Sequence, residues 1–251
     1  MMTPDGDEKR VNWDTAKTCL AQLHHLAPNI LRQGVLIGGI ACWFYRNLLS
    51  KAKDPDFGVP ILTAAQERLW LSKDIDFTNF FAQDAREMLP EHLAKDEHGH
   101  LRLLVGGIPI GFAQVGVTFD PDSAWVESWI GTFTWDGNEV QFRILDPVSL
   151  YLEKQALSQK RGAPADSLHL AVMAEFLRYE TLRQIETLVS AKVLEDRALP
   201  VKFLFAIRDR APEICRDGRM QRRLFQQTST AALLPPSERK LVADITESAQ
   251  S

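Results

Sequence analysis

The sequence predicts an α+β fold: a mixed sheet with flanking helices, followed by a C-terminal helical region. Two patterns predict the sheet. One is an apolar run that ends in paired glycines, Val35–Ala41, and the other is a pair of hairpin signatures over 101–119 and 129–145. The third observation is a change in the residue pattern at Pro147, after which runs of β-branched residues become rare and helical periodicity dominates.

The chain of 251 residues is long enough for one or two compact units. We predict an α+β domain over residues 13–146 and a helical region over residues 147–251. Before the first hairpin the predicted elements are a helix over 14–26 capped by Asp14 and closed by Pro28, a strand over 35–37, a helix over 40–49, a loop over 50–60, a short helix within 61–71 and an amphipathic helix over 80–94. Later helices are predicted over 148–158, 165–194, 201–210, 221–228 and 238–249.

The composition is that of an ordinary globular protein, with 45% hydrophobic and 25% charged residues. A formal net charge of −4 argues against a generally basic protein that coats nucleic acid. No apolar run approaches the roughly 18 residues that span a bilayer, and residues 1–12 lack a signal-peptide core, so we expect a cytoplasmic protein with no membrane partner. The three widely spaced cysteines are typical of reduced thiols.

The paired glycines predict a binding site for an anion. Gly38 and Gly39 follow a short strand and open a helix, and glycine lets the backbone turn tightly and approach a ligand closely. The free amides at the start of the helix point at whatever lies over the glycines. A triphosphate would fit such a site.

Asp74 and Asp76 are candidate metal ligands. They are two residues apart, so in a strand both carboxylates project from one face. Mg²⁺ prefers oxygen ligands and is often shared with phosphate, so two carboxylates beside an anion site suit it. The alternative is a solvated strand end, which is the commoner setting for a lone Asp-x-Asp.

In this order the motifs resemble the DNA polymerase β-like nucleotidyltransferase superfamily. Gly38–Ala41 together with Lys73–Phe77 is similar to the AbiEii/AbiGii toxin group within it. The resemblance implies a nucleotidyltransferase-like sheet and Mg²⁺ held by catalytic Asp74 and Asp76. It also implies transfer of a nucleoside monophosphate from a nucleoside triphosphate to a hydroxyl of RNA or protein. The group further implies a toxin of a toxin–antitoxin or abortive-infection system, with a cognate antitoxin as partner.

A second constellation follows Pro147. Lys154, on the predicted helix, could reach a phosphate or pair with a neighbouring carboxylate, and Asp166 could cap the helix expected from about Ser167. The resemblance, which spans about 35–173, places Lys154 on the nucleotide triphosphate and makes Arg161 and Asp166 further nucleotide-binding residues.

One departure from the superfamily pattern leaves the mechanism open. Members that catalyse transfer usually add a third carboxylate from a later strand. Neither face of the strand predicted over 108–119 carries an acidic residue. Asp120, Asp122 and Glu127 follow it in a predicted loop or turn, so the third carboxylate is not located. The alternative function is a degenerate nucleotidyltransferase fold that binds nucleotide or protein without catalysis.

Three other patterns each allow two interpretations. The loop over 50–60 could be functional, as a lid or as a contact with the acceptor, or it could be simply variable. Tryptophans near the second hairpin could stack on a base, although cross-strand packing is their commoner role: Trp125, Trp129 and Trp135. The densest basic cluster could steer RNA or form a solvated helix face: Arg216, Arg219, Arg222 and Arg223.

Overall fold

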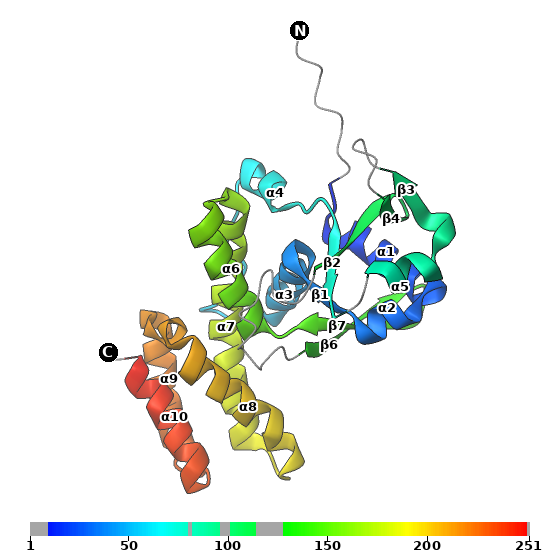
Figure 1. The fold of residues 1–251 in the computed structure, drawn as a ribbon. Coiled ribbons are helices and arrows are strands. Elements are labelled where there is room, and N and C mark those ends of the chain that lie inside the picture. The colour runs from blue at the N-terminus through cyan, green and yellow to red at the C-terminus, as the bar shows by residue number, and fades with distance from the viewer. Residues whose placement is uncertain (1–9, 80–81, 96–100, 114–127, 250–251) are drawn as a thin grey trace. The chain divides into compact units, whose positions relative to one another are not determined.

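The computed structural model describes residues 10–79, 82–95, 101–113 and 128–249. It confirms the α+β class, with a seven-stranded mixed sheet and flanking helices (Figure 1). The chain forms two compact units. Unit 1 comprises the chain up to Tyr45 together with 61–169, and unit 2 comprises 46–60 together with the chain from Leu170.

The sheet lies in unit 1, in the strand order β3-β4-β5-β2-β1-β7-β6. Strand β1 is antiparallel to β2 and parallel to β7, while β2 is parallel to β5. All three residues of β1 are buried, as expected for a short apolar strand at the centre of a mixed sheet. The strands are β1 (Val35–Ile37), β2 (Ile75–Thr78), β3 (Leu93–Lys95), β4 (Leu101–Val105), β5 (Ile108–Phe112), β6 (Ser128–Trp135) and β7 (Asn138–Leu145).

Both predicted hairpins are confirmed. The glycine pair 106–107 joins β4 to β5 with φ of 61° and 76°, and Asp136 and Gly137 join β6 to β7 with φ of 48° and 80°. Positive φ at both central residues suits the twist of a tight hairpin, which explains the glycines. The predicted continuation of β5 over 114–119 lies outside the described residues, as does Trp125. Trp129 packs edge-on against Tyr45, with ring centroids 6.2 Å apart.

The helices of unit 1 correct three details of the prediction. Asn12, not Asp14, is the N-cap of the first helix, because its side chain accepts a hydrogen bond from the Thr15 amide. Pro28 starts a second helix instead of only closing the first. The helix predicted over 80–94, with a late break or kink at Pro90, ends at Met88, before that proline, and does not continue as an α-helix beyond it. Helices that lie wholly in this unit are α1 (Trp13–Leu26), α2 (Pro28–Gln33), α4 (Ala64–Trp70), α5 (Ala82–Met88), the 3₁₀ turn η1 (Pro90–His92) and α6 (Pro147–Arg161).

Two long helices contribute residues to both units: α3 (Gly38–Ala52) and α7 (Pro164–Ser190). The predicted boundary at residue 147 follows the change from strand to helix, whereas the units divide after His169. The difference arises because α6, although helical, packs within unit 1. No helix among the described residues combines the length and apolarity that crossing a membrane requires.

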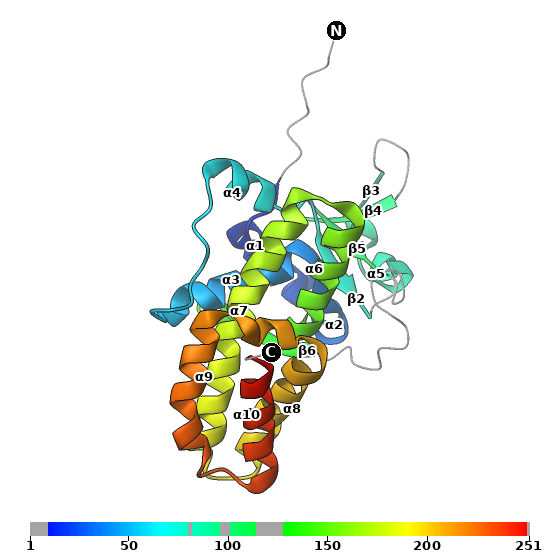
Figure 2. The same cartoon turned by 90° about the vertical axis from the view of Figure 1, so that its left-hand side faces the viewer.

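Unit 2 is helical, as predicted for this part of the chain. Helix α10 (Pro236–Ser248) packs against α8 (Glu195–Arg210) and α9 (Gly218–Ala231), and the 3₁₀ turn η2 (Pro212–Arg216) lies between the last two in sequence (Figure 2). Its core consists of buried apolar side chains of these helices, among them Leu204, Ile207, Met220, Leu224 and Ile245.

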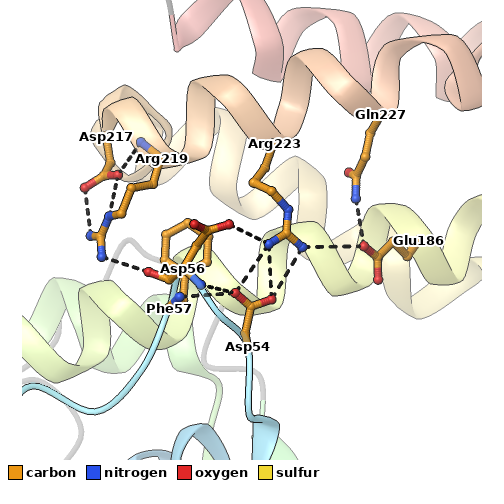
Figure 3. Close-up of polar contacts among 8 residues, drawn as sticks. All are labelled: Asp54, Asp56, Phe57, Glu186, Asp217, Arg219, Arg223 and Gln227. Atoms are coloured by element: carbon orange, nitrogen blue, oxygen red, sulfur yellow. Dashed lines mark hydrogen bonds and ion pairs between the residues drawn. The ribbon is translucent and has the colours of Figure 1, made fainter.

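Two arginines of the basic cluster form an ion-pair network within unit 2 (Figure 3). Arg219 pairs with Glu175 at 2.7 Å and with Asp217 at 2.9 Å. Arg223 pairs with Asp56 at 2.9 Å and with Asp54 at 3.4 Å. The network therefore holds the segment 53–60 against α9 and stabilises this contact. Arg219 and Arg223 are thus partly exposed and paired within the unit, whereas the side chains of Arg216 and Arg222 are exposed.

Candidate functional site

The register of the central strands brings the first glycine and the second aspartate of the motif together. Ile37 pairs with Asp76 across β1 and β2, so Asp76 lies beside the turn that follows β1. A Cβ atom added to Gly38 would stand 3.1 Å from Oδ2 of Asp76. Gly38 also has a φ of 73°, which favours glycine. The anion site expected at the glycines and one candidate metal ligand are thus neighbours.

Asp74 lies directly before β2 and Asp76 lies within it, and both are half-buried. Burial raises the pKa of Asp74, which Arg102 and a hydrogen bond with Ser72 oppose. Burial also raises the pKa of Asp76 to about 7, with further increases from the charges of Asp74 and Glu153 and opposition from Lys154. The two carboxylates therefore repel each other in a place poorly solvated by water. A cation between them would relieve this cost.

Lys154 is buried on α6, and its Nζ lies 3.7 Å from Oδ1 of Asp166. Burial opposes the charge of the ammonium, but neighbouring Cys42, Glu153 and Asp166 raise its pKa above the ordinary value, as does Asp76. Lys154 therefore remains a cation at neutral pH, close to the carboxylates of the site. The ion pair with Asp166 agrees with the interpretation that Lys154 pairs with a neighbouring carboxylate. The charge of Lys154 also acts on Asp76 and lowers its pKa.

Asp166 is not the cap of a helix that starts near Ser167. Helix α7 begins at Pro164, so Asp166 lies in its first turn, buried and paired with Lys154. Arg161 is the last residue of α6 and is exposed, and its charge acts on Glu153. The structure therefore gathers Gly38, Asp74, Asp76, Lys154 and Asp166 and leaves Arg161 at their edge.

Sequence reasoning missed two buried groups of this site. Glu153 is 6% exposed, and burial raises the pKa of its carboxyl. His169 lies where a Cβ added to Gly39 would be 3.3 Å from its Cε1, and its ring packs edge-on against Trp70 with centroids 4.5 Å apart. Burial, together with Lys154, lowers the pKa of His169 to about 3, so its imidazole is neutral. The usable signal was spacing, because His169 follows Asp166 by three residues on one helix face.

A cavity of about 220 Å³ opens beside Asp74. Two arginines line it, Arg86 of α5 and Arg102 of β4, and Gly111 of β5 forms part of its wall. The remaining wall is largely apolar, with Leu103, Pro109, Ile110 and Phe112. Neither arginine was singled out from the sequence, because only the pairing of β4 with β5 and β5 with β2 brings Arg102 to the aspartates.

The described residues contain no group of three or more side chains already arranged as a metal site. On β5 the residue that pairs with Asp76 is Gly111, where an added Cβ would overlap the Asp76 carboxylate. The described part of β5 therefore supplies no third acid, and Asp120, Asp122 and Glu127 lie outside the described residues. Asp74 and Asp76 still fit Mg²⁺ chemically, since they are hard oxygen donors of raised pKa and Mg²⁺ commonly uses one or two carboxylates plus phosphate and water.

Comparisons of this chain with protein-family models, with curated proteins and with solved structures find no match. The residues of the site and their geometry therefore carry the functional proposal.

Proposed function

We propose that the chain is a Mg²⁺-dependent nucleotidyltransferase that moves a nucleoside monophosphate from a nucleoside triphosphate to a hydroxyl acceptor. One observation carries this proposal: Asp76 is packed against the Gly38 turn, where a strand ends and a helix begins. The glycine turn that we expect to bind an anion and the carboxylate pair meet there, with the buried ammonium of Lys154 nearby. The resemblance to AbiEii-like nucleotidyltransferases depends on these same residues.

Each group has a distinct role in the proposed reaction. The amides that open α3 at Gly38 and Gly39, together with the Lys154 ammonium, would bind the β- and γ-phosphates. Asp74 and Asp76 would hold Mg²⁺, which when bound neutralises phosphate charge and orients the triphosphate. The acceptor oxygen bonds to the α-phosphorus, the bond from that phosphorus to pyrophosphate breaks, and the hydroxyl proton passes to the carboxylate pair.

The resemblance also supplies the biological setting of the proposal. It implies a cytoplasmic toxin of a toxin–antitoxin or abortive-infection system, held in check by a cognate antitoxin. Within the proposed reaction, such a toxin would act by modifying an RNA or protein hydroxyl.

The test is transfer of label. The full chain is incubated with each α-labelled nucleoside triphosphate, Mg²⁺ and total tRNA, and labelled product is resolved on a gel. We expect transfer that chelation of Mg²⁺ abolishes and that Asp74→Asn/Asp76→Asn loses. The matched control is Asp209→Asn, which neutralises an exposed carboxylate paired with Arg208. No transfer by the wild type, or equal transfer by the double variant, contradicts the proposal.

Gly111 favours one alternative function. Because β5 presents a glycine to Asp76, the described part of β5 adds no third carboxylate to Asp74 and Asp76. A site of that kind could bind nucleotide and Mg²⁺ in an interaction module without turnover. Titration calorimetry with a nucleoside triphosphate and Mg²⁺ separates the two functions, since binding without turnover supports the module and turnover excludes it.

A further inference from the structure

Strand β6 forms one edge of the sheet. The strand order ends at β6, and among the described residues β7 is the strand that pairs with it. Helix α1 covers one face of β6, where Phe133 lies edge-on to Trp13 with ring centroids 6.0 Å apart. No backbone hydrogen bond between described residues reaches the outer side of β6. Over the described part of the chain, this side of the strand is therefore an unpaired edge.

The hairpin determines which backbone groups of β6 point outward. Because Asp136 and Gly137 form a two-residue turn, the flanking residues Trp135 and Asn138 exchange hydrogen bonds, and every second residue of β6 before them does the same with β7. The alternate residues turn their N–H and C=O groups away from β7: Ser128, Ile130, Thr132 and Thr134. Their side chains share one face of the strand, on which Ile130 is 64% exposed.

The β6 edge lacks the features that usually prevent strands from pairing. Edge strands are commonly protected by charged side chains, by proline, by a bulge or by short length. Strand β6 has eight residues with no charge and no proline among them, and its register with β7 runs without a bulge. The edge at the other end of the strand order is different, because β3 has three residues and ends in Lys95. The contrast favours β6 as a strand that pairs with another chain.

The charges at the two ends of the β6 edge favour a second copy of this chain as the partner. At one end, Arg143 of β7 donates a hydrogen bond of 2.8 Å from Nε to Oγ of Ser128. At the other end, Asp136 is exposed in the turn. In an antiparallel pair of β6 strands centred on Thr132, Ser128 of each copy lies opposite Asp136 of the other. The basic end of each edge then meets the acidic end of the other, as a two-fold axis requires.

We propose that two copies of the chain associate through β6, as an antiparallel pair with its two-fold axis at Thr132. Thr132 then faces its own copy, and Ile130 faces Thr134 of the second copy. Such cross-strand pairs stabilise a sheet, whereas a parallel pair would bring ends of like charge together. Edge pairing buries less surface than a standard interface, so we expect a dissociation constant of about 1–100 µM. This association does not depend on the proposed transfer reaction.

The first experiment measures the oligomeric state of the full chain by analytical ultracentrifugation over a concentration series. Thr132→Pro removes an outward N–H and leaves the bonds to β7 in place, and Ile130→Lys puts a charge on the edge. We expect each variant to weaken association at least about tenfold. The control is Ile61→Lys, which replaces an isoleucine of the same unit that is 100% exposed and should leave association unchanged.

Thermal unfolding and circular dichroism report whether each variant folds. Ile130→Lys keeps the test valid if Thr132→Pro does not fold, because the Ile130 side chain is largely exposed.

The second experiment tests the register by oxidative cross-linking. The three native cysteines are buried, so Thr132→Cys supplies an accessible thiol. Across a hydrogen-bonded antiparallel pair the Cα atoms are about 5.5 Å apart, which a disulfide spans. We expect Thr132→Cys to form a covalent dimer at least about tenfold faster than the control Ile61→Cys, because pairing raises the local concentration of its thiol.

Association that both edge variants weaken and Ile61→Lys retains supports the proposal. A chain that stays monomeric throughout the concentration series overturns it, as does a dimer that both edge variants leave intact. Purification of the chain with a different protein that Thr132→Pro releases overturns the second copy as the partner. Equal cross-linking rates for Thr132→Cys and Ile61→Cys overturn the register about Thr132.

Discussion

The carboxylates of the candidate site and those of the ion-pair network in unit 2 have opposite electrostatics. At the site, burial and mutual repulsion raise the pKa of Asp76 to about 7. In the network, hydrogen bonds from Arg219 lower the pKa of Asp217 to about 2. The network matches its carboxylates with guanidinium partners, whereas at the site Asp76, Glu153 and Asp166 share the charge of Lys154. An incompletely compensated charge destabilises a fold, and charges of that kind are concentrated at functional sites, which supports the proposed function.

The two regions also have opposite effects on stability as the pH changes. The pKa of Asp76 lies above its ordinary value of 3.8, so between about pH 4 and 7 the folded chain holds a proton that the unfolded chain has lost. This group therefore lowers stability as the pH rises through that range. The pKa of Asp217 lies below 3.8, so its contribution to stability is present above that value and is lost as the pH falls towards 2.

The largest expected effect is that of Asp76→Asn. Removing this carboxylate should lower transfer about 100- to 1000-fold, because several kcal/mol of metal-based stabilisation disappear. The same change should raise the melting temperature of the metal-free protein, since a charge penalised by burial is removed. Asp217→Asn is the matched control and should do the reverse, with transfer retained and stability lowered. Parallel effects of the two substitutions would remove the contrast between the regions.

Gly38→Ala should lower transfer about 10- to 100-fold, because the new methyl group would stand 3.1 Å from the Asp76 carboxylate and displace it. Gly137→Ala is the control, since its φ of 80° is equally unfavourable for alanine but an added Cβ has nothing within 4 Å. Both variants should lose about 1–2 kcal/mol of stability, and only Gly38→Ala should lose activity. Steady-state assays and urea unfolding report the two quantities. Equal loss of activity in both variants would show that backbone strain alone is responsible.

Mg²⁺ should raise the melting temperature of the wild type by about 2–4 °C per kcal/mol of binding free energy, and by more at about pH 8 than at about pH 5. The reason is that a proton on Asp76, whose pKa is about 7, competes with the cation. Scanning calorimetry with and without chelator measures the shift. A shift that is independent of pH, or that persists in Asp74→Asn/Asp76→Asn, would place the cation elsewhere.

The smallest expected effect is that of Arg219→Gln in the network. It should lower the free energy of unfolding by about 1 kcal/mol, because the pairs with Glu175 and Asp217 are partly exposed and the guanidinium also lies 5.0 Å from the Phe57 ring centre. Transfer should not change. Urea unfolding at low and high salt tests this, since a real ion-pair contribution shrinks as salt rises. A salt-independent loss would instead indicate the contact with Phe57.

Local sequence by itself determined the α+β class, the two hairpins and the strand–glycine–helix unit at Val35–Ala41. These features depend on signals within a few residues, namely glycine at positive φ, alternation in strands and periodicity in helices. The aspartate pair was recognised for the same reason. The sequence predicted the cap of α1 at Asp14 instead of Asn12, and the start of α7 near Ser167 instead of Pro164. Several polar residues near a helix end can serve as its cap, and packing selects among them.

Only the tertiary structure decided what surrounds those aspartates. The sheet order brings Gly111 and Arg102 to Asp76 and Asp74, although no local rule states which strands pair. In the same way, Arg223 pairs with Asp56 across 167 residues of sequence, an ion pair that the local pattern of the basic cluster does not predict. Strand register and ion pairing between distant residues are set by the burial of the whole unit, and a short stretch of sequence does not contain that information.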